Sequence, residues 1–287
     1  MTDALGPSPA VDALLRTVLA AVQGEEWEEA VRVLEEGLES EPGDPYLLCW
    51  LGLAERELGL EAAATEHFRM VLDTSPQDPV LLATTGNALA ATDDPAAGLA
   101  LRTAALLAPE LAQARWMYGA FLAREGMVSD ALEELEAAAR LEPDDPVIYL
   151  EIGVARALAG EMELAANAFG RAIELDPEDG WPLLLLGLAR VELGDLEEAL
   201  GPLDEGARLR PEDLEAQLLA ALALAAAGWE ERAMEMLERA RVGTEPGDED
   251  RLAEVDERIE DGPEAALACL AESLGPSSFR ERLLQRP

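Results

Sequence analysis

The sequence predicts an all-α solenoid of about seven two-helix repeats with a C-terminal capping helix pair. The stretch from Pro146 to Asp179 reads as two amphipathic helices joined at Gly160, and the same pattern recurs along the chain. Apolar residues in each half follow the i, i+3, i+4, i+7 spacing of one helix face. A single hairpin of this kind cannot bury both apolar faces, so we expect copies of it to stack on either side.

Four ladders of equivalent residues support the repeat. Prolines that end the second helices recur at spacings of 34, 33, 34, 34 and 34 residues, at Pro42, Pro76, Pro109, Pro143, Pro177 and Pro211. A small residue recurs in the second helix at Ala30, Ala64, Ala97, Ala131, Ala165, Ala199 and Ala233. A glycine recurs in the first helix at Gly52, Gly86, Gly119, Gly153 and Gly187, and a turn glycine at Gly59, Gly126, Gly160, Gly194 and Gly228. The small residues indicate helix axes that approach closely.

These ladders divide the chain into segments. We expect a flexible N-terminal tail at 1–9, repeats at 10–44, 45–78, 79–111, 112–145, 146–179, 180–213 and 214–247, degenerate capping helices at 248–274, and a C-terminal tail at 275–287. The third repeat is one residue short, and we place the deletion at 92–94, where the turn glycine is missing. Asp-Pro pairs predict capped helix starts at Asp44, Asp78, Asp94 and Asp145.

Composition excludes several partners. The chain has 21 basic and 60 acidic residues, a net charge of −39, and every basic side chain other than His67 is arginine. Such a surface repels phosphates and anionic lipids, so no nucleic-acid partner is expected. No apolar run reaches 18 residues, so no membrane insertion is expected. The N-terminus lacks the basic region of a signal peptide, and the two cysteines predict no disulfide framework, which favours a cytoplasmic location.

Catalytic chemistry has little support in the sequence. His67 is the single histidine and is expected on the surface of a second helix. No Ser/His/Asp arrangement can be completed away from it, and the sequence has no Cys/His set for a metal ion. The glycines are dispersed at the repeat period and do not form a phosphate-binding loop. We therefore expect no catalytic, metal-binding or cofactor-binding residues and interpret the chain as non-enzymatic.

The period, together with a glycine eight residues into the unit, an alanine twenty in and a proline near the end, resembles the tetratricopeptide repeat (TPR). In the unit at 146–179 the signature positions hold Tyr149, Ile152, Gly153, Arg156, Ala165, Phe169, Ala172 and Pro177. The resemblance covers about 11–247 and extends more weakly to 274. It implies a right-handed superhelix in which the first helix of each repeat lines a concave groove.

The resemblance also allows one known kind of partner to be tested against the sequence. The family's best-known peptide site grips a C-terminal carboxylate with Lys, Arg and Asn side chains. The corresponding positions here hold Leu15, Leu19, Cys49, Leu53, Ala83 and Asn87, so that clamp is absent. Acidic chaperone tails are therefore not expected as partners.

Most groove positions that the resemblance assigns are apolar, whereas the acids concentrate in the second helices and turns. We predict a partner-binding groove formed by Tyr46, Leu53, Trp116, Val147, Leu150, Val154, Trp181, Leu184 and Leu188. The matching partner is a protein or peptide segment, amphipathic or extended, with apolar anchors and basic flanks. The alternative is that these leucines and valines pack between neighbouring first helices, and that the alanines reflect codon bias.

The tail at 275–287 is the only locally basic stretch. Two outcomes stay open for it: a short helix that folds back on the acidic body or binds a partner, or plain disorder. For the whole chain, the preferred function is a protein–protein interaction scaffold or chaperone-like adaptor. The alternatives are a self-assembling structural scaffold, which would be a homo-oligomer, and an accessory subunit of a secretion or enzyme assembly.

Overall fold

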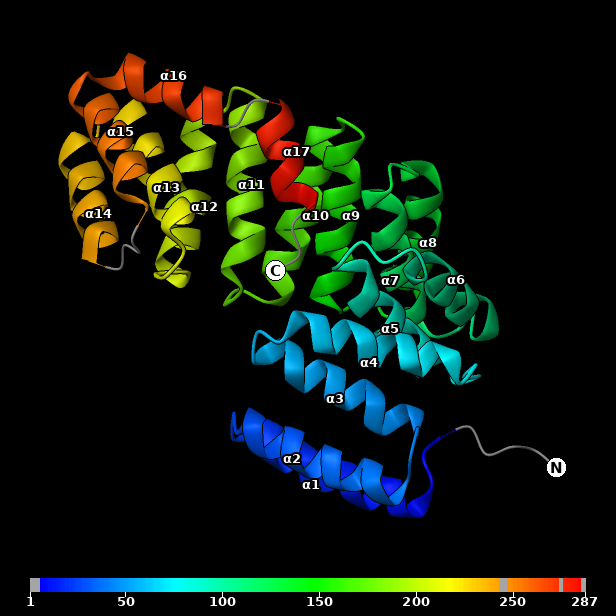
Figure 1. Ribbon diagram of the computed structural model, residues 1–287. Coiled ribbons are helices and arrows are strands. Elements are labelled where there is room, and N and C mark those ends of the chain that lie inside the picture. Colours follow the sequence, from blue (N-terminus) through cyan, green and yellow to red (C-terminus); the bar gives the residue numbers. More distant parts are fainter. Residues whose placement is uncertain (1–5, 243–246, 274–275, 285–287) are drawn as a thin grey trace. The chain divides into compact units, whose positions relative to one another are not determined.

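The computed structural model describes residues 6–242, 247–273 and 276–284, and every regular element in these ranges is an α-helix (Figure 1). The chain divides into two compact units, Met1–Leu122 and Ala123–Pro287. The first unit contains α1 (Pro9–Gln23), α2 (Trp27–Ser40), α3 (Pro45–Glu57), α4 (Glu61–Asp73), α5 (Pro79–Ala90), α6 (Ala97–Leu107) and most of α7 (Ala112–Arg124). The second contains α8 (Val128–Leu141), α9 (Pro146–Leu158), α10 (Met162–Leu175), α11 (Gly180–Glu192), α12 (Leu196–Leu209), α13 (Leu214–Ala226), α14 (Glu230–Val242), α15 (Glu249–Glu260), α16 (Pro263–Ser273) and α17 (Pro276–Leu284).

Helices α1 to α6 of the first unit and α9 to α14 of the second unit form three consecutive pairs in each unit. Inside each unit, helices that follow one another in the chain pack against each other, from α1 to α6 and from α8 to α16. This is the packing of a repeat solenoid, so the predicted all-α solenoid with capping helices is confirmed. The first helix begins at Pro9, where the Ser8 hydroxyl accepts a hydrogen bond from the Val11 N–H at 3.2 Å. The expected N-terminal tail is thus helical at its last residue, and residues 1–5 lie outside the described ranges.

Aspartates begin the first helices of five repeats. The side chain of each accepts at least one backbone N–H from the first turn of its helix, at Asp44, Asp78, Asp145, Asp179 and Asp213. Three of the four Asp-Pro pairs therefore cap a helix as predicted. The pair at Asp94 differs, because α6 begins only at Ala97 and has Ala96 at its cap position.

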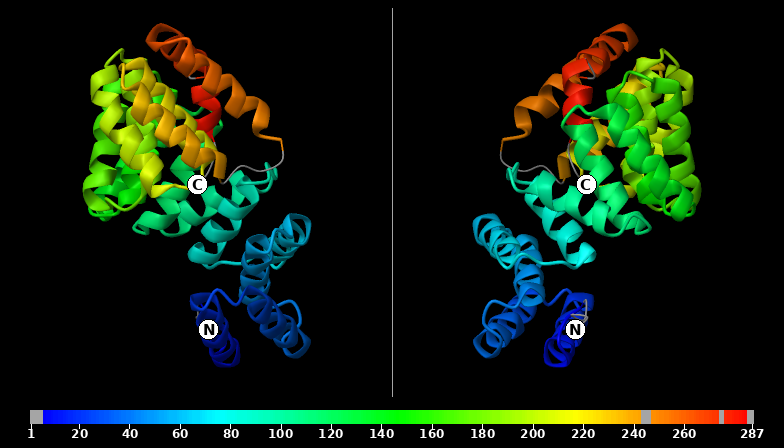
Figure 2. Two further views of the ribbon diagram at one scale, coloured as in Figure 1. Left: turned by 90° about the vertical axis from the view of Figure 1, so that its left-hand side faces the viewer. Right: turned by 90° about the vertical axis from the view of Figure 1, so that its right-hand side faces the viewer.

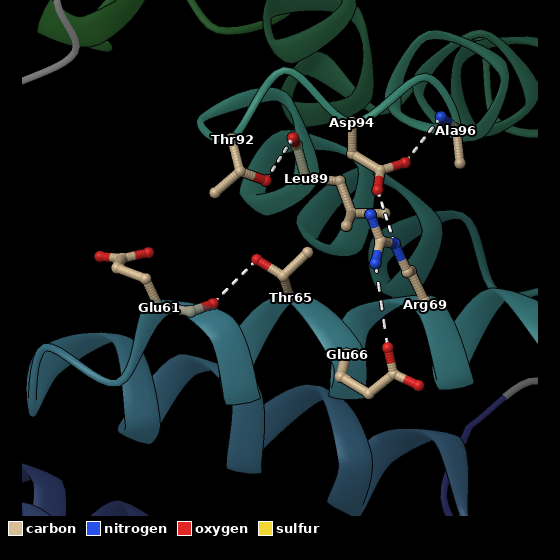
Figure 3. Close-up of polar contacts among 8 residues, drawn as sticks. All are labelled: Glu61, Thr65, Glu66, Arg69, Leu89, Thr92, Asp94 and Ala96. Carbon is tan, nitrogen blue, oxygen red and sulfur yellow. Dashed lines mark hydrogen bonds and ion pairs between the residues drawn. The ribbon is translucent and has the colours of Figure 1, made fainter.

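The turn before α6 explains this difference (Figure 3). Asp94 is buried; its carboxylate accepts the Ala96 N–H at 2.9 Å and the Nε–H of Arg69, from α4, at 2.7 Å. These bonds, the one from Ala96 foremost, hold the pKa of Asp94 below its usual value. The carboxylate therefore ties the shortened turn to the preceding second helix instead of capping α6 directly.

In each of the seven repeats, one residue of the turn between the two helices has a positive φ. It is held by Glu25, Gly59, Asp93, Gly126, Gly160, Gly194 and Gly228, with φ between 54° and 83°. Glycine adopts this left-handed region without steric cost, whereas other residues are disfavoured there. The first and third repeats thus make the same turn with a glutamate and an aspartate in place of glycine.

The first-helix glycines mark the close approach of the two helices in a pair, as predicted. A Cβ at Gly153 would lie 2.4 Å from the Phe169 ring, and one at Gly187 would lie 2.5 Å from Leu203. Phe169 and Leu203 are fully buried. The missing side chain is what lets each large residue of the second helix lie directly against the first helix.

The C-terminal region departs from simple stacking. Helix α13 is buried at ten consecutive positions, Ala216 to Ala225, and it contacts α12, α14, α15 and α16. Helix α17 turns back and packs against α9 instead of its neighbours in the sequence (Figure 1 and Figure 2). Residues 276–284 of the predicted tail are therefore a docked helix.

Candidate functional site

The predicted groove residues of the second unit lie on α9 and α11. Leu150, Val154, Leu184 and Leu188 expose only 6, 2, 3 and 1% of their surface. They belong to one buried apolar cluster that also contains Phe279 and Leu283 of α17. In this structure they pack internally, as the alternative interpretation of the sequence expected, and part of that packing comes from the C-terminal helix.

Helix α17 is amphipathic over its two turns. Phe279 and Leu283, one helical turn apart, are 3 and 2% exposed, whereas Arg280 and Glu281 face solvent. Arg282 lies beside the apolar pair and is also buried. Its guanidinium donates to the carboxylate of Glu215 on α13, with Nε 3.1 Å from Oε1. Among the described side chains of α17, the two apolar anchors and the Arg282–Glu215 contact hold the helix in place.

Glu215 joins three helices. Besides Arg282, it accepts a hydrogen bond from Arg251 of α15, with Nη2 2.8 Å from Oε1. Burial by itself would raise the pKa of Glu215, but the two guanidinium groups lower it below its usual value. The carboxylate therefore stays ionised near neutral pH and is shared between α15 and α17.

An open cleft adjoins this contact. It has a volume of about 150 Å³, and its lining includes Trp181, Leu184, Leu188, Arg210, Glu215 and Arg282. The Trp181 ring is half-buried, with the Arg210 guanidinium carbon 5.2 Å from its centre, a cation–π distance. Arg210 in turn donates to Asp213 at 3.0 Å. We call α9, α11, α13 and this cleft the first-helix surface; it has an apolar floor and a charged rim.

Val147 is the most exposed of the predicted groove residues. It lies in the first turn of α9 and exposes 39% of its surface. The structure therefore places the predicted residues of the second unit on the first helices of two consecutive repeats, α9 and α11. Val147 and Trp181 stay accessible. The other four predicted residues are buried: Leu150, Val154, Leu184 and Leu188.

The three predicted residues of the first unit are half-buried. Tyr46 and Leu53 border one apolar cluster, and Trp116 borders another. The Tyr46 hydroxyl donates to the Asp78 carboxylate at 2.8 Å, and burial, followed by this carboxylate, raises the Tyr46 pKa. Tyr46 thus connects α3 to the capping residue of α5. The structure does not bring these three residues into one cluster.

Two features escaped the sequence analysis. The first is the set of α17 contacts, whose signal was an aromatic residue, an arginine and a leucine at positions i, i+3 and i+4. The second is the surface of α6, where Leu99 and Leu106 expose 72 and 71%. Its signal was the absence of acidic residues from 95–109, which distinguishes α6 from the other second helices.

His67 is less exposed than expected. Its Nδ1 lies 2.7 Å from a carboxylate oxygen of the buried Glu55, so the pair connects α4 to α3. Across the described ranges, no group of three or more His, Cys, Asp or Glu side chains is placed to hold a metal ion. No helix in the same ranges is long and apolar enough to cross a membrane.

Comparisons with known proteins agree with this architecture. A comparison with curated protein sequences gives no match. Among solved structures, a chain of the APC/C hetero-tetramer Cut9–Hcn1 is 19% identical, with a TM-score of 0.68 over 84% of this chain and 48% of that one. A tetratricopeptide repeat protein from Parabacteroides merdae is 14% identical, with a TM-score of 0.63 over 91% and 100%. The type IV pilus biogenesis factor PilW is 19% identical, with a TM-score of 0.62 over 70% and 94%.

At these identities the likeness shows the fold alone. The family assignment comes from the sequence, which matches the model of the tetratricopeptide repeat over residues 15–79, 122–180 and 184–249. These matches cover more than half of the chain, and they coincide with helix pairs that carry the glycine, alanine and turn ladders described above. The chain belongs to the tetratricopeptide repeat family.

Proposed function

We propose that this protein is a non-enzymatic adaptor that binds a segment of a partner protein on the first-helix surface of its second unit. Membership of the tetratricopeptide repeat family supports a role in protein–protein interaction in general. The finer proposal rests on the cleft beside Trp181, whose apolar floor of Leu184 and Leu188 adjoins the carboxylate of Glu215. Apolar clefts with a few charged groups at the rim are typical ligand sites.

The surface defines the chemistry of the segment. An apolar floor accommodates aromatic or aliphatic anchors, and a helix presents such anchors at i and i+4. The ionised Glu215 favours an arginine next to them. The net charge of −39 also attracts basic segments and repels acidic ones before contact. We therefore expect an amphipathic helix with two apolar anchors and a basic flank.

A peptide-display selection tests this proposal. Random twelve-residue peptides are panned against the full chain, and enriched sequences are measured by fluorescence anisotropy. We expect enriched peptides to share apolar residues at i and i+4 and a nearby arginine. Trp181→Ala should weaken their binding at least ten-fold because it removes the wall of the cleft, and replacing the shared arginine of a selected peptide by glutamate should do so because it reverses the charge that meets Glu215.

Trp229→Ala is the matched control. Trp229 lies just before α14, exposes 46% of its surface and is stacked on Arg232 at 5.0 Å, so it resembles Trp181 in chemistry but not in position. Its substitution should leave peptide affinity unchanged. Circular dichroism checks that both protein variants keep their helicity. Enrichment of acidic peptides, or equal binding of the selected peptides to the wild type and the Trp181→Ala variant, contradicts the proposal.

A further inference from the structure

We propose that α17 is a displaceable occupant of the first-helix surface, so that a partner helix of the same chemistry must compete with the chain's own C-terminal segment. This inference rests on the proposed function and adds a regulatory step to it. The competing segment belongs to another protein and carries an aromatic residue at i, an arginine at i+3 and an aliphatic residue at i+4.

The first support is that α17 already has the chemistry that the surface selects. Phe279 and Leu283 enter the apolar cluster with Leu150 and Val154, and Arg282 meets Glu215. The residues between them, Arg280 and Glu281, face solvent and contribute little to the contact. In the proposed function these are the features of a bound partner helix, supplied here in the same chain.

The second support is that α17 can leave without dismantling the fold. It has nine residues, and a helix of that length is not stable in water without tertiary contacts. Helices α15 and α16 cover α13 independently of it. Glu215 also keeps Arg251 as a partner after Arg282 departs, so undocking leaves no buried carboxylate without a counter-charge.

The third support is the cleft next to the docked helix. Arg282 lines it together with Trp181 and Leu188, so it adjoins the α17 contact and remains open while α17 is in place. A partner can therefore make its first contacts beside α17 and then replace it stepwise. A surface sealed completely by its occupant would offer no such starting point.

Tethering sets the size of the effect. A segment joined to its site by a short linker competes at an effective concentration on the order of millimolar. If α17 is docked for about 90 to 99% of the time, the apparent affinity for a competing helix falls roughly ten- to one-hundred-fold. Weakening α17 should raise partner affinity by the same factor.

Fluorescence anisotropy with a labelled synthetic peptide of residues 276–284 tests this. The proteins are the wild-type chain and the double variant Phe279→Ser with Leu283→Ser, in which α17 loses both anchors. We expect the peptide to bind the variant at least ten-fold more tightly than the wild type. A peptide carrying the same two serines is the control and should bind neither chain. Equal affinity for both chains overturns the proposal and leaves α17 a fixed cap.

Hydrogen exchange in the wild-type chain gives a second measurement that does not depend on the variant. A saturating concentration of the wild-type peptide should increase amide exchange in α17, because the helix is released. Binding without a change in α17 protection overturns the displacement proposal while the proposed function stands. If neither this peptide nor any display-selected peptide binds either chain, the proposed function fails as well. A wild-type dimer in sedimentation velocity that the double variant does not form would overturn the intramolecular assignment.

Discussion

Gly153 and Gly170 lie in the same repeat, yet their surroundings are opposite. A Cβ at Gly153 would fall 2.4 Å from the Phe169 ring, whereas one at Gly170 would meet no heavy atom within 4 Å. The first glycine makes room for a buried aromatic ring. The second lies inside α10, where it only adds conformational freedom to the unfolded chain. The same residue type therefore stabilises one helix contact and weakens another helix.

We predict that Gly153→Ala lowers the free energy of unfolding by about 1–3 kcal/mol, because an overpacked core must shift to accept the methyl group. Gly170→Ala, the matched control, should raise it by about 0.5–1 kcal/mol through helix propensity. Urea unfolding followed by circular dichroism measures both changes. A neutral Gly153→Ala would show that the Phe169 ring moves aside without cost.

Single arginine residues contribute through the planar shape of the guanidinium group as well as through its charge. Arg124 donates from Nη1 and Nη2 to the two carboxylate oxygens of Glu151, at 2.7 and 3.2 Å, and both side chains are about nine-tenths buried. Such two-pronged contacts require a planar guanidinium. The choice of arginine over lysine therefore has a structural use at this position.

At the scale of elements, the turn between the two helices keeps a residue with positive φ in every repeat. Its left-handed residue is glycine in five repeats, Glu25 in the first and Asp93 in the third. Aspartate tolerates the left-handed region better than glutamate does, because its short side chain can bond locally. The first repeat therefore holds its turn at the greatest local cost.

Glu25→Gly should stabilise the chain by a few tenths to about 1 kcal/mol, since it removes the steric cost of the positive φ. The reciprocal change Gly160→Ala should destabilise by about 1 kcal/mol, because φ is 77° there and no neighbouring atom adds a clash. Thermal unfolding of both variants beside the wild type provides the measurement. Changes of the same sign in the two variants would contradict a shared turn conformation.

The repeat ladders predicted helix order, capping aspartates and close glycine contacts because all of these depend on residues within one or two repeats. Part of the packing on α9 comes from a segment about 130 positions later, since α17 contacts α9 and Phe279 lies in the cluster of Leu150. Periodicity carries no information about such a contact. A short basic helix of nine residues has too weak a pattern to reveal its docking site, so its two outcomes stayed open until the structure placed it.

Charge is the property that acts on the molecule as a whole. The 60 acidic side chains outnumber the 21 arginines, and many ion pairs, such as Arg32 with Glu36, are exposed and local. Exposed pairs contribute little to stability, whereas uncompensated like charges repel one another throughout the surface. We therefore expect net repulsion to dominate the electrostatic part of the folding free energy.

Adding sodium chloride should accordingly raise the melting temperature, by roughly 2–6 °C between 0.02 and about 0.3 M, because screening shortens the Debye length. The gain should level off above that concentration, which separates screening from a general salt effect on hydration. Differential scanning calorimetry at constant pH measures it. A melting temperature that falls with salt would mean that the ion pairs outweigh the repulsion.

The burial of α13 has a consequence for synthesis. Its cover is made by α15 and α16, and 47 residues separate Ala226 from Ser273. At about 5–20 residues per second, a ribosome needs roughly 2–9 seconds to produce them. During that interval the nascent chain carries an apolar helix that packs against α12 but lacks the cover that α15 and α16 later supply. The C-terminal helices therefore set the moment at which this apolar surface leaves water.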